Sequence, residues 1–411
     1  MKILYLHPKS WSGEYPLLRK FVSLGHDVFV LEESRTGAGP ARWVTDHYAI
    51  VDDAITTLWY DPSRGFEKLV TWPVDRFFKK SFEGRNLAHR MLIIRSAIAR
   101  FSPDIVVASD GFSYAVPAAF LRRMGGMHQR FVVSYIGGDI LDCPEAEVGK
   151  RRTRLTDWLI RSSVRIPDIL RPVSPLMRRR LLDDGANDAH IRVIPSHLVS
   201  DMSYLDNVFR QRGVISAKIR AQHGIADAEP VIVTLGGNQK GKGLQILVKA
   251  WQQVLAKIPQ ARWMLCGPRS RWLEDEILPM LSRLDLSSNV VVVGELGTNA
   301  VFDYLAAADL HVNPSLCESL NMATVEAAAV GTPSICSDGA GIADWIRRVG
   351  AGRVIAKGEV SELADAIISA LSSVTSRSVW SVAGRHLALE FSLDRVSRDL
   401  LDCFKPASNT K

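Results

Sequence analysis

CESLNMATVEAAAVGTP, at residues 317–333, says more about architecture and chemistry than any other part of the chain. It follows a strand-like apolar run at 310–312, and its alanine-rich part is typical of a helix that ends at Gly331. Glu318 and Glu326 stand eight positions apart, a little over two helical turns, so both carboxylates can enter one pocket at different depths. The free N–H groups at the start of this helix suit a phosphate group.

Strands, turns and helices alternate through both halves of the chain. This alternation predicts an α/β protein with two facing Rossmann-like domains, which bind ligands at the carboxyl ends of the strands, in a cleft between the domains. Residues 196–215 lack clear periodicity and are expected to link the halves, and residues 145–165 are expected to form a long polar helix. The strands are expected at 3–6, 27–31, 105–108, 131–136, 168–174, 191–195, 231–235, 262–266, 290–293, 310–312 and 334–337, with helices dominating after that.

Size and composition are those of a soluble protein with two domains. The chain has 411 residues, of which 47% are apolar and 23% charged. It has no apolar run close to the roughly 20 residues that a membrane span needs. The five cysteines are scattered and form no metal-binding pattern, which predicts buried free thiols in a reducing, cytoplasmic compartment. They are Cys143, Cys266, Cys317, Cys336 and Cys403.

The net charge of +7 favours anionic partners such as nucleotide phosphates, acidic glycans or lipid headgroups. Basic residues alternate with apolar ones in segments 76–100 and 150–161. Such segments can lie on an anionic membrane, so peripheral contact with its inner face is one expectation. A helix with one face in the core and one solvated basic face is the alternative. Nucleic acid is not an expected partner.

A glycine-rich loop at 235–243 follows a predicted buried strand and carries Lys240 and Lys242. Glycines let the backbone approach phosphate, and lysines neutralise it. The spacing is close to that of a P-loop, but Gly243 stands where a P-loop has the Ser or Thr that holds magnesium. The loop therefore indicates phosphate binding and argues against an NTPase.

The pattern Glu-x7-Glu followed by Ala-Ala-x-Gly-Thr-Pro resembles the signature of the retaining nucleotide-sugar glycosyltransferases of the GT-B fold, family four. The resemblance implies that Glu318 lies beside the donor sugar and is catalytic, and that Glu326 binds the ribose hydroxyls. It also implies that backbone amides between the two hold the diphosphate. Those amides belong to Ser319, Leu320, Asn321 and Met322.

The resemblance extends to other loops of the donor site. Lys242 matches the family lysine that binds the diphosphate, whereas Gly237 stands where the family has an arginine, so Lys240 is a candidate for the missing charge. Gly13 lies in the loop that faces the donor phosphates in the family. The loop expected to contact the nucleobase contains Gly294, Glu295 and Leu296.

In the first half, the family's His-Gly-x-Asp motif has Ile136 in place of its histidine but keeps Asp139. The resemblance makes Asp139 a second catalytic candidate that could bind hydroxyls of the donor or the acceptor. The missing histidine leaves the choice of sugar open.

The sequence as a whole predicts transfer of a sugar from a nucleotide-diphosphate sugar, with UDP favoured, to an acceptor hydroxyl with retention. Residues 1–200 would bind the acceptor, residues 201–388 the donor, and residues 389–411 would return as a helix to the first domain. No cofactor and no metal are expected, and the acceptor would be a glycan, a lipid-linked sugar or a small molecule. Two alternatives stay open, namely an inactive nucleotide- or glycan-binding protein and a sugar-nucleotide epimerase of the same fold.

Overall fold

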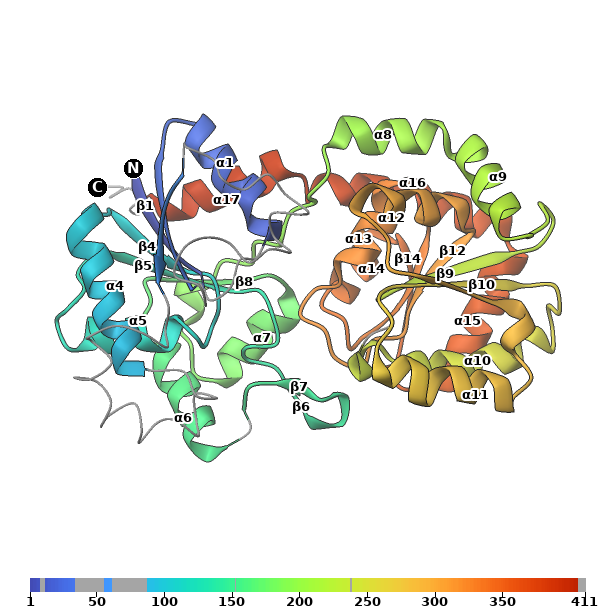
Figure 1. The fold of residues 1–411 in the computed structure, drawn as a ribbon, viewed down its shortest axis with the longest axis horizontal. Helices are drawn as coiled ribbons and strands as arrows, with labels where there is room; N and C mark the ends of the chain where they lie inside the picture. Colours follow the sequence, from blue (N-terminus) through green and yellow to red (C-terminus); the bar gives the residue numbers. More distant parts are fainter. Residues whose placement is uncertain (8–11, 34–54, 61–86, 152, 237–238, 406–411) are drawn as a thin grey trace. The chain divides into compact units, whose positions relative to one another are not determined.

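The computed structural model describes all residues except 8–11, 34–54, 61–86, 152, 237–238 and 406–411 (Figure 1). The chain divides into two compact units. Unit 1 contains residues 1–142, 149–199 and 393–411. Unit 2 contains residues 143–148 and 200–392.

Unit 1 is built on a parallel sheet in the order β3-β2-β1-β4-β5-β8. Apart from Lys2 and Arg130 at their starts, its inner strands β1, β4 and β5 are buried and mostly apolar, as expected for strands covered on both faces. The chain runs outward from β1 in one direction and from β4 in the other, so the order reverses between these two strands. The strands are β1 (Lys2–His7), β2 (Asp27–Glu33), β3 (Thr56–Tyr60), β4 (Ile105–Ala108), β5 (Arg130–Tyr135) and β8 (Ile169–Pro172).

Helices pack on this sheet, and the last helix of the chain is one of them. Helix α17 runs beside α1 (Figure 1), with Phe404 edge-on to Phe21 at 5.9 Å and Asp394 paired with Lys20 at 2.6 Å. The described helices are α1 (Tyr15–Ser23), α4 (Leu87–Phe101), α5 (Ala115–Arg123), α6 (Arg154–Ser163), α7 (Pro175–Asp183) and α17 (Leu393–Phe404), with the short turns η1 (Ser12–Glu14) and η3 (Asp188–His190).

Unit 2 repeats the design with a parallel sheet in the order β11-β10-β9-β12-β13-β14. The order reverses between β9 and β12. Trp251 and Trp263 pack edge to face in its core, and the indole of Trp263 donates to the Thr234 hydroxyl at 2.9 Å. The strands are β9 (Val231–Leu235), β10 (Arg262–Cys266), β11 (Val290–Gly294), β12 (Leu310–Asn313), β13 (Ser334–Ser337) and β14 (Gly352–Ile355).

The helices of unit 2 cover both faces of the sheet (Figure 1). They are α8 (Met202–Arg210), α9 (Arg212–Gln222), α10 (Leu244–Leu255), α11 (Leu278–Arg283), α12 (Thr298–Ala307), α13 (Met322–Ala329), α14 (Ala343–Val349), α15 (Val360–Ser372) and α16 (Val374–Leu389). Short turns are η2 (Pro144–Ala146), η4 (Lys240–Lys242), η5 (Leu273–Ile277) and η6 (Ser287–Asn289). The prediction of an α/β protein with two Rossmann-like parallel sheets is confirmed.

Several local predictions are wrong. The helix expected at 145–165 begins only at Arg154, because β6 (Asp142–Cys143) and β7 (Val148–Gly149) form a hairpin first. Gly149 has φ +116°, a left-handed conformation that would interrupt a helix. Residues 191–195 make one bridge rather than a strand, and β14 was not expected. Residues 196–215, predicted only to link the two halves, contain α8.

The cysteine prediction also needs correction. Cys143 and Cys317 form a disulfide across 174 positions, while Cys266, Cys336 and Cys403 are free. The sequence gives no local signal for this disulfide, because its two cysteines meet only in the tertiary fold.

Two arginines of the predicted basic surfaces are internal. Arg90 on α4 is fully buried and donates to the Ser113 carbonyl at 2.6 Å. The Arg151 side chain is almost fully buried and pairs with Asp184 and Asp157. Arg90 and Arg151 therefore make contacts inside the fold and are not on the surface. Membrane contact by the rest of segments 76–100 and 150–161 stays a prediction. In the described part of the chain, no helix is both long and apolar enough to cross a membrane.

Candidate active site

The reversal of strand order in unit 2 brings two predicted loops together. Strands β9 and β12 are neighbours in the sheet, so their carboxyl ends lie side by side. The loop after β9 carries Lys242, and the loop after β12 carries Glu318. Open parallel α/β sheets bind ligands at such a reversal point. This edge of the sheet is therefore the candidate active site of unit 2.

Backbone contacts lock the two loops to each other. Leu316 donates its N–H to the carbonyl of Gly241 at 2.8 Å, and Glu318 donates its N–H to Gly339 at 2.9 Å. Gly243 precedes α10 with φ +72°, and a Cβ there would collide with the carbonyl oxygen of Pro314. A glycine is required because both the dihedral angle and the space exclude a side chain.

We predict that Gly243→Ala separates these loops and destabilises unit 2 by about 1–3 kcal/mol, from left-handed strain and the clash together. Gly213→Ala is the matched control, because Gly213 lies in α9 and a Cβ there would meet nothing within 4 Å. Denaturant unfolding followed by fluorescence measures both variants. An unchanged Gly243→Ala protein would show that the loops do not need this close approach.

Three side chains hold the Glu318 carboxylate. Lys242 donates from Nζ to Oε1 at 2.5 Å, while Ser315 Oγ and Asn321 Nδ2 donate to Oε2 at 2.9 and 2.6 Å. Burial alone would raise the pKa of Glu318, but the Lys242 ammonium and these hydrogen bonds outweigh burial and lower it. Glu318 is therefore an ionised, fixed carboxylate beside a lysine.

Asn321 does more than the sequence indicated. It has φ +83°, a left-handed conformation that Asn tolerates better than most residues. Its side-chain oxygen accepts from the Thr324 N–H at 2.8 Å and from the Thr324 hydroxyl at 2.7 Å, which caps α13. Its amide meanwhile orients Glu318. An Asn just before an alanine-rich helix is the sequence signal for this cap, whereas the sequence-based prediction concerns only the backbone amide of Asn321.

Glu326 differs from Glu318 in protonation. It lies on α13, and burial raises its pKa to about 7, with Lys242 acting in the opposite direction. Glu326 therefore exchanges its proton near neutral pH, whereas Glu318 stays ionised. His311 on β12 is fully buried, and burial, assisted by Lys242, lowers its pKa to about 3. His311 is neutral and adds no positive charge at physiological pH.

The other predicted donor residues divide into three groups. Ser319, Leu320 and Met322 lie at or just before the start of α13. Gly294 ends the edge strand β11, and Glu295 and Leu296 follow it at the same end of the sheet. Lys240 pairs with Glu147 at 3.6 Å. Gly237 falls outside the described residues.

In unit 1, Asp139 follows β5 and is almost fully buried. It accepts the Gly111 N–H, and its Oδ1 is buried with no hydrogen-bond partner. Burial, together with the nearby charge of Asp110, raises the pKa of Asp139 to about 7. Asp110 itself accepts the N–H groups of Ser113 and Tyr114, both at 2.9 Å. Asp139 is thus a carboxyl group poised between its two protonation states.

Gly13 lies in η1, where the sequence pointed to phosphate and missed the adjacent polar cluster. Glu14 is buried, bonds His7 Nε2 at 3.0 Å, and lies 4.0 Å from Arg171 Nη1. Burial would raise the pKa of Glu14, but His7 and Arg171 outweigh it and lower the pKa. His7 and Glu14 lie seven residues apart, but Arg171 is distant in the sequence and shares no motif with them.

Two family models match the chain. The model described as glycosyl transferases group 1 matches residues 229–373. The model described as glycosyl transferase 4-like domain matches residues 15–197. The candidate site around Lys242, Glu318 and Glu326 lies inside the first match.

Related proteins and structures agree with these matches. The D-inositol 3-phosphate glycosyltransferase of Nocardia farcinica is 27% identical over 228 residues, 54% of this chain and 49% of the relative. The putative colanic acid biosynthesis glycosyltransferase WcaL of Salmonella typhimurium is 24% identical over 409 residues, 92% of each chain. Several curated relatives are thus matched over only about half of their own length.

The crystal structure of HepE from Anabaena in complex with UDP has a TM-score of 0.74 to this chain. The similarity covers 98% of this chain and 99% of HepE at 17% identity, so it concerns the fold. The fold, the two family models and the relatives support the assignment of this chain to the glycosyltransferases of the GT-B fold.

Proposed function

We propose that this protein transfers a sugar from a nucleotide-diphosphate sugar, UDP-linked in preference, to an acceptor hydroxyl with retention at C1. The observation that carries the proposal is the 2.5 Å contact between Lys242 and Glu318 where the strand order of unit 2 reverses. The contact places an ammonium group, which can bind a diphosphate, next to a fixed carboxylate, which can bind a sugar. HepE, whose structures contain UDP and glucose, lends support to UDP as the nucleotide.

The chemistry of sugar transfer fits these charges. Negative charge builds on the departing diphosphate and positive charge on the sugar ring. Lys242 and the N–H groups at the start of α13 stabilise the first charge, and ionised Glu318 faces the second. Glu326 binds the ribose hydroxyls, and the lysine and the helix start supply the positive charge that a metal ion would otherwise bring.

Retention implies that the acceptor attacks the face of C1 that the diphosphate leaves. A phosphate oxygen of the leaving group then takes the acceptor proton. Unit 1 supplies the acceptor side, and Asp139 is the residue proposed to bind a sugar or acceptor hydroxyl there. Its unpartnered Oδ1 is consistent with that role because buried carboxyl oxygens normally have a partner.

A donor panel tests the proposal. Purified protein is incubated with UDP- and GDP-sugars, and released nucleoside diphosphate is measured together with the anomer first formed, by proton NMR before mutarotation. We expect UDP release with retention, and a fall of at least about 10²-fold in Glu318→Gln. Glu276→Gln, which changes an exposed carboxylate in unit 2, is the control and is expected to stay active.

Other outcomes select the alternatives. UDP binding without turnover would favour an inactive binding protein, and conversion of the donor into its epimer would favour an epimerase. An inverted first product would leave glycosyl transfer standing and overturn retention.

A further inference from the structure

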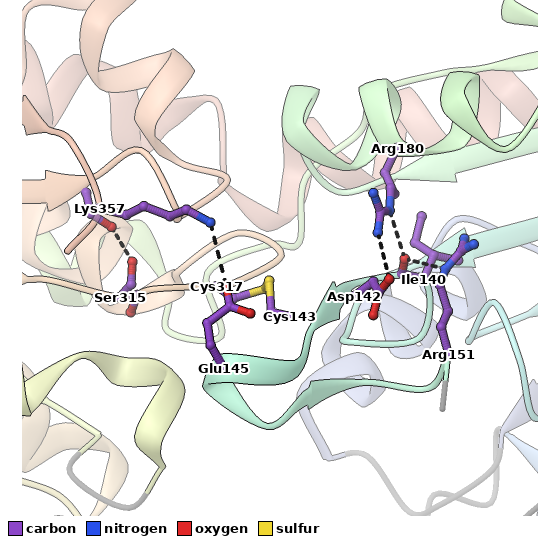
Figure 2. The surroundings of a disulfide bond; sticks show 10 residues. Ile140, Asp142, Cys143, Glu145, Arg151, Arg180, Ser315, Cys317 and Lys357 are labelled. Atoms are coloured by element: carbon purple, nitrogen blue, oxygen red, sulfur yellow. Dashed lines mark hydrogen bonds and ion pairs between the residues drawn. A yellow bond between two sulfur atoms is a disulfide. The ribbon is translucent and has the colours of Figure 1, made fainter. Parts of the chain in front are cut away.

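The disulfide lies directly beside the candidate site. Cys317 precedes Glu318 in the loop after β12, and its partner Cys143 opens the short Cys143–Val148 segment (Figure 2). The Cα atoms of the two cysteines are 6.4 Å apart, within the usual range for a disulfide. Cys317 is therefore the sequence neighbour of Glu318, the residue whose carboxylate accepts from Lys242.

The Cys143–Val148 segment packs against the turn η4 (Lys240–Lys242), which is called the phosphate loop below because Lys242 is proposed to bind the diphosphate. Ala146 is buried, and a Cβ placed on Gly241 would lie 3.0 Å from Cγ2 of Val148 and 3.5 Å from the Ala146 carbonyl oxygen. Gly241 also accepts the Leu316 N–H, so it contacts the segment on one side and the Glu318 loop on the other. The segment thus lies on the loop that ends in Lys242.

The segment also brings two acidic side chains to this cationic surface. Glu147 pairs with Lys240 at 3.6 Å, and Glu145 pairs with Lys357 at 3.9 Å (Figure 2 shows the second pair). Lys240 is the lysine proposed to supply the charge that is missing at Gly237. The negative charge of Glu147 beside Lys240 reduces the attraction of this turn for a diphosphate.

The ion pairs alone cannot hold the segment firmly. The four side chains in the two pairs are 44–75% exposed, and exposed ion pairs contribute little because water and salt screen them. The other contacts of the segment described above are the packing of Ala146 and Val148 near Gly241 and the disulfide. The covalent bond is the strongest of these, so its redox state decides whether the segment stays on the loop.

We propose that Cys143 and Cys317 form a reversible redox-modification site that controls the donor site: oxidation holds the segment on the phosphate loop and weakens donor binding, and reduction releases it. This inference rests on the proposed function only for its effect on the donor. Its oxidant is a small-molecule disulfide such as glutathione disulfide, with a dithiol as the reductant.

The exchange is balanced in two steps. Cys143 is the more exposed of the pair, so its thiolate attacks one sulfur of the small disulfide and releases one thiolate. The buried Cys317 thiolate then attacks the Cys143 sulfur of the mixed disulfide and releases the second thiolate. Two electrons pass from the cysteine pair to the small disulfide, and the two protons of the protein thiols end on the released thiols.

The test compares the whole protein equilibrated in glutathione buffers of different ratio. Alkylation and mass spectrometry report the Cys143–Cys317 bond, hydrogen exchange reports residues 144–148, and calorimetry reports UDP affinity. We expect oxidation to protect the segment from exchange and to weaken UDP binding about two- to fivefold, as loss of one exposed charge would do. Cys143→Ser is expected to behave as the reduced protein in every buffer, and Cys403→Ser as the wild type.

A second variant separates the bond from the charge. Glu147→Gln is expected to form the disulfide normally and to recover much of the UDP affinity in the oxidised state. The proposal is overturned if the cysteines do not pair in oxidising buffer, or if they pair while exchange at 144–148 stays unchanged. Absence of UDP binding in both redox states, with exchange still responding, would instead contradict the proposed function and retain the switch of the segment.

Discussion

Replacing Lys242 by methionine is expected to lower donor turnover about 10²- to 10³-fold, as the loss of one preorganised charge at a reacting group does. The ammonium of Lys242 is the positive group fixed against Glu318 at 2.5 Å, and it opposes the burial that raises the pKa of Glu326. Methionine keeps most of the length and the apolar stem but removes the charge. The diphosphate would then leave without that compensation.

The loss of Lys242 also changes its neighbours. Without the ammonium, burial of Glu318 is opposed only by Ser315 and Asn321, so the pKa of Glu318 is expected to rise. Steady-state release of nucleoside diphosphate measures turnover for Lys242→Met. Lys249→Met removes an exposed lysine from α10 and serves as the control, with activity expected to stay within about twofold. Equal activity in the two variants would exclude Lys242 from the donor site.

Replacing Glu326 by glutamine is expected to stabilise the protein at pH 8 and to weaken its binding of UDP. Burial raises the pKa of this carboxyl in the folded protein from its ordinary value of 4.5 to about 7. Because the folded state holds the proton more tightly than the unfolded chain, stability falls as pH rises from 4.5 to about 7 and is lowest above that. The full penalty is at most about 3 kcal/mol.

Glutamine carries no such penalty, so the difference in unfolding free energy between Glu326→Gln and wild type should grow by about 1–3 kcal/mol between pH 5 and pH 8. Urea unfolding at both pH values measures this growth, with Glu276→Gln as a control whose difference stays flat. A gain in stability with a loss of UDP affinity would mark a residue retained for binding at the expense of stability. A difference independent of pH would show that Glu326 ionises as freely in the fold as outside it.

The sequence predicts the parts of the molecule that depend on local patterns. Runs such as Val231–Leu235 are apolar and bounded by glycine-rich turns, so the strands and their order of appearance follow from periodicity. The segment around Glu318 is recognisable in the sequence because a strand-like run, a short loop and an alanine-rich helix follow one another within about 20 residues. The position of Lys242 near a ligand was predictable in the same way, because it lies in a glycine-rich loop directly after a predicted buried strand.

Features that depend on contacts between distant segments were not predictable. Cys143 lies in the β6-β7 hairpin and pairs with Cys317 after β12, and Arg171 on β8 meets His7 and Glu14 near the end of β1, so both groups form only in the tertiary fold. The prediction of one helix over 145–165 was wrong because a polar composition does not distinguish a helix from an exposed hairpin. The dual role of Asn321 needed its left-handed backbone, which one sequence does not specify.

Calorimetric titration of UDP tests most directly whether Lys242 and Glu326 form a nucleotide site in unit 2. The titrations use the reduced wild-type protein and the double variant Lys242→Met/Glu326→Gln. We predict saturable binding by the wild type and at least about a hundredfold weaker binding by the double variant, because a phosphate contact and a ribose contact are lost together. Equal affinity in both proteins, or no binding by the wild type, would contradict the account.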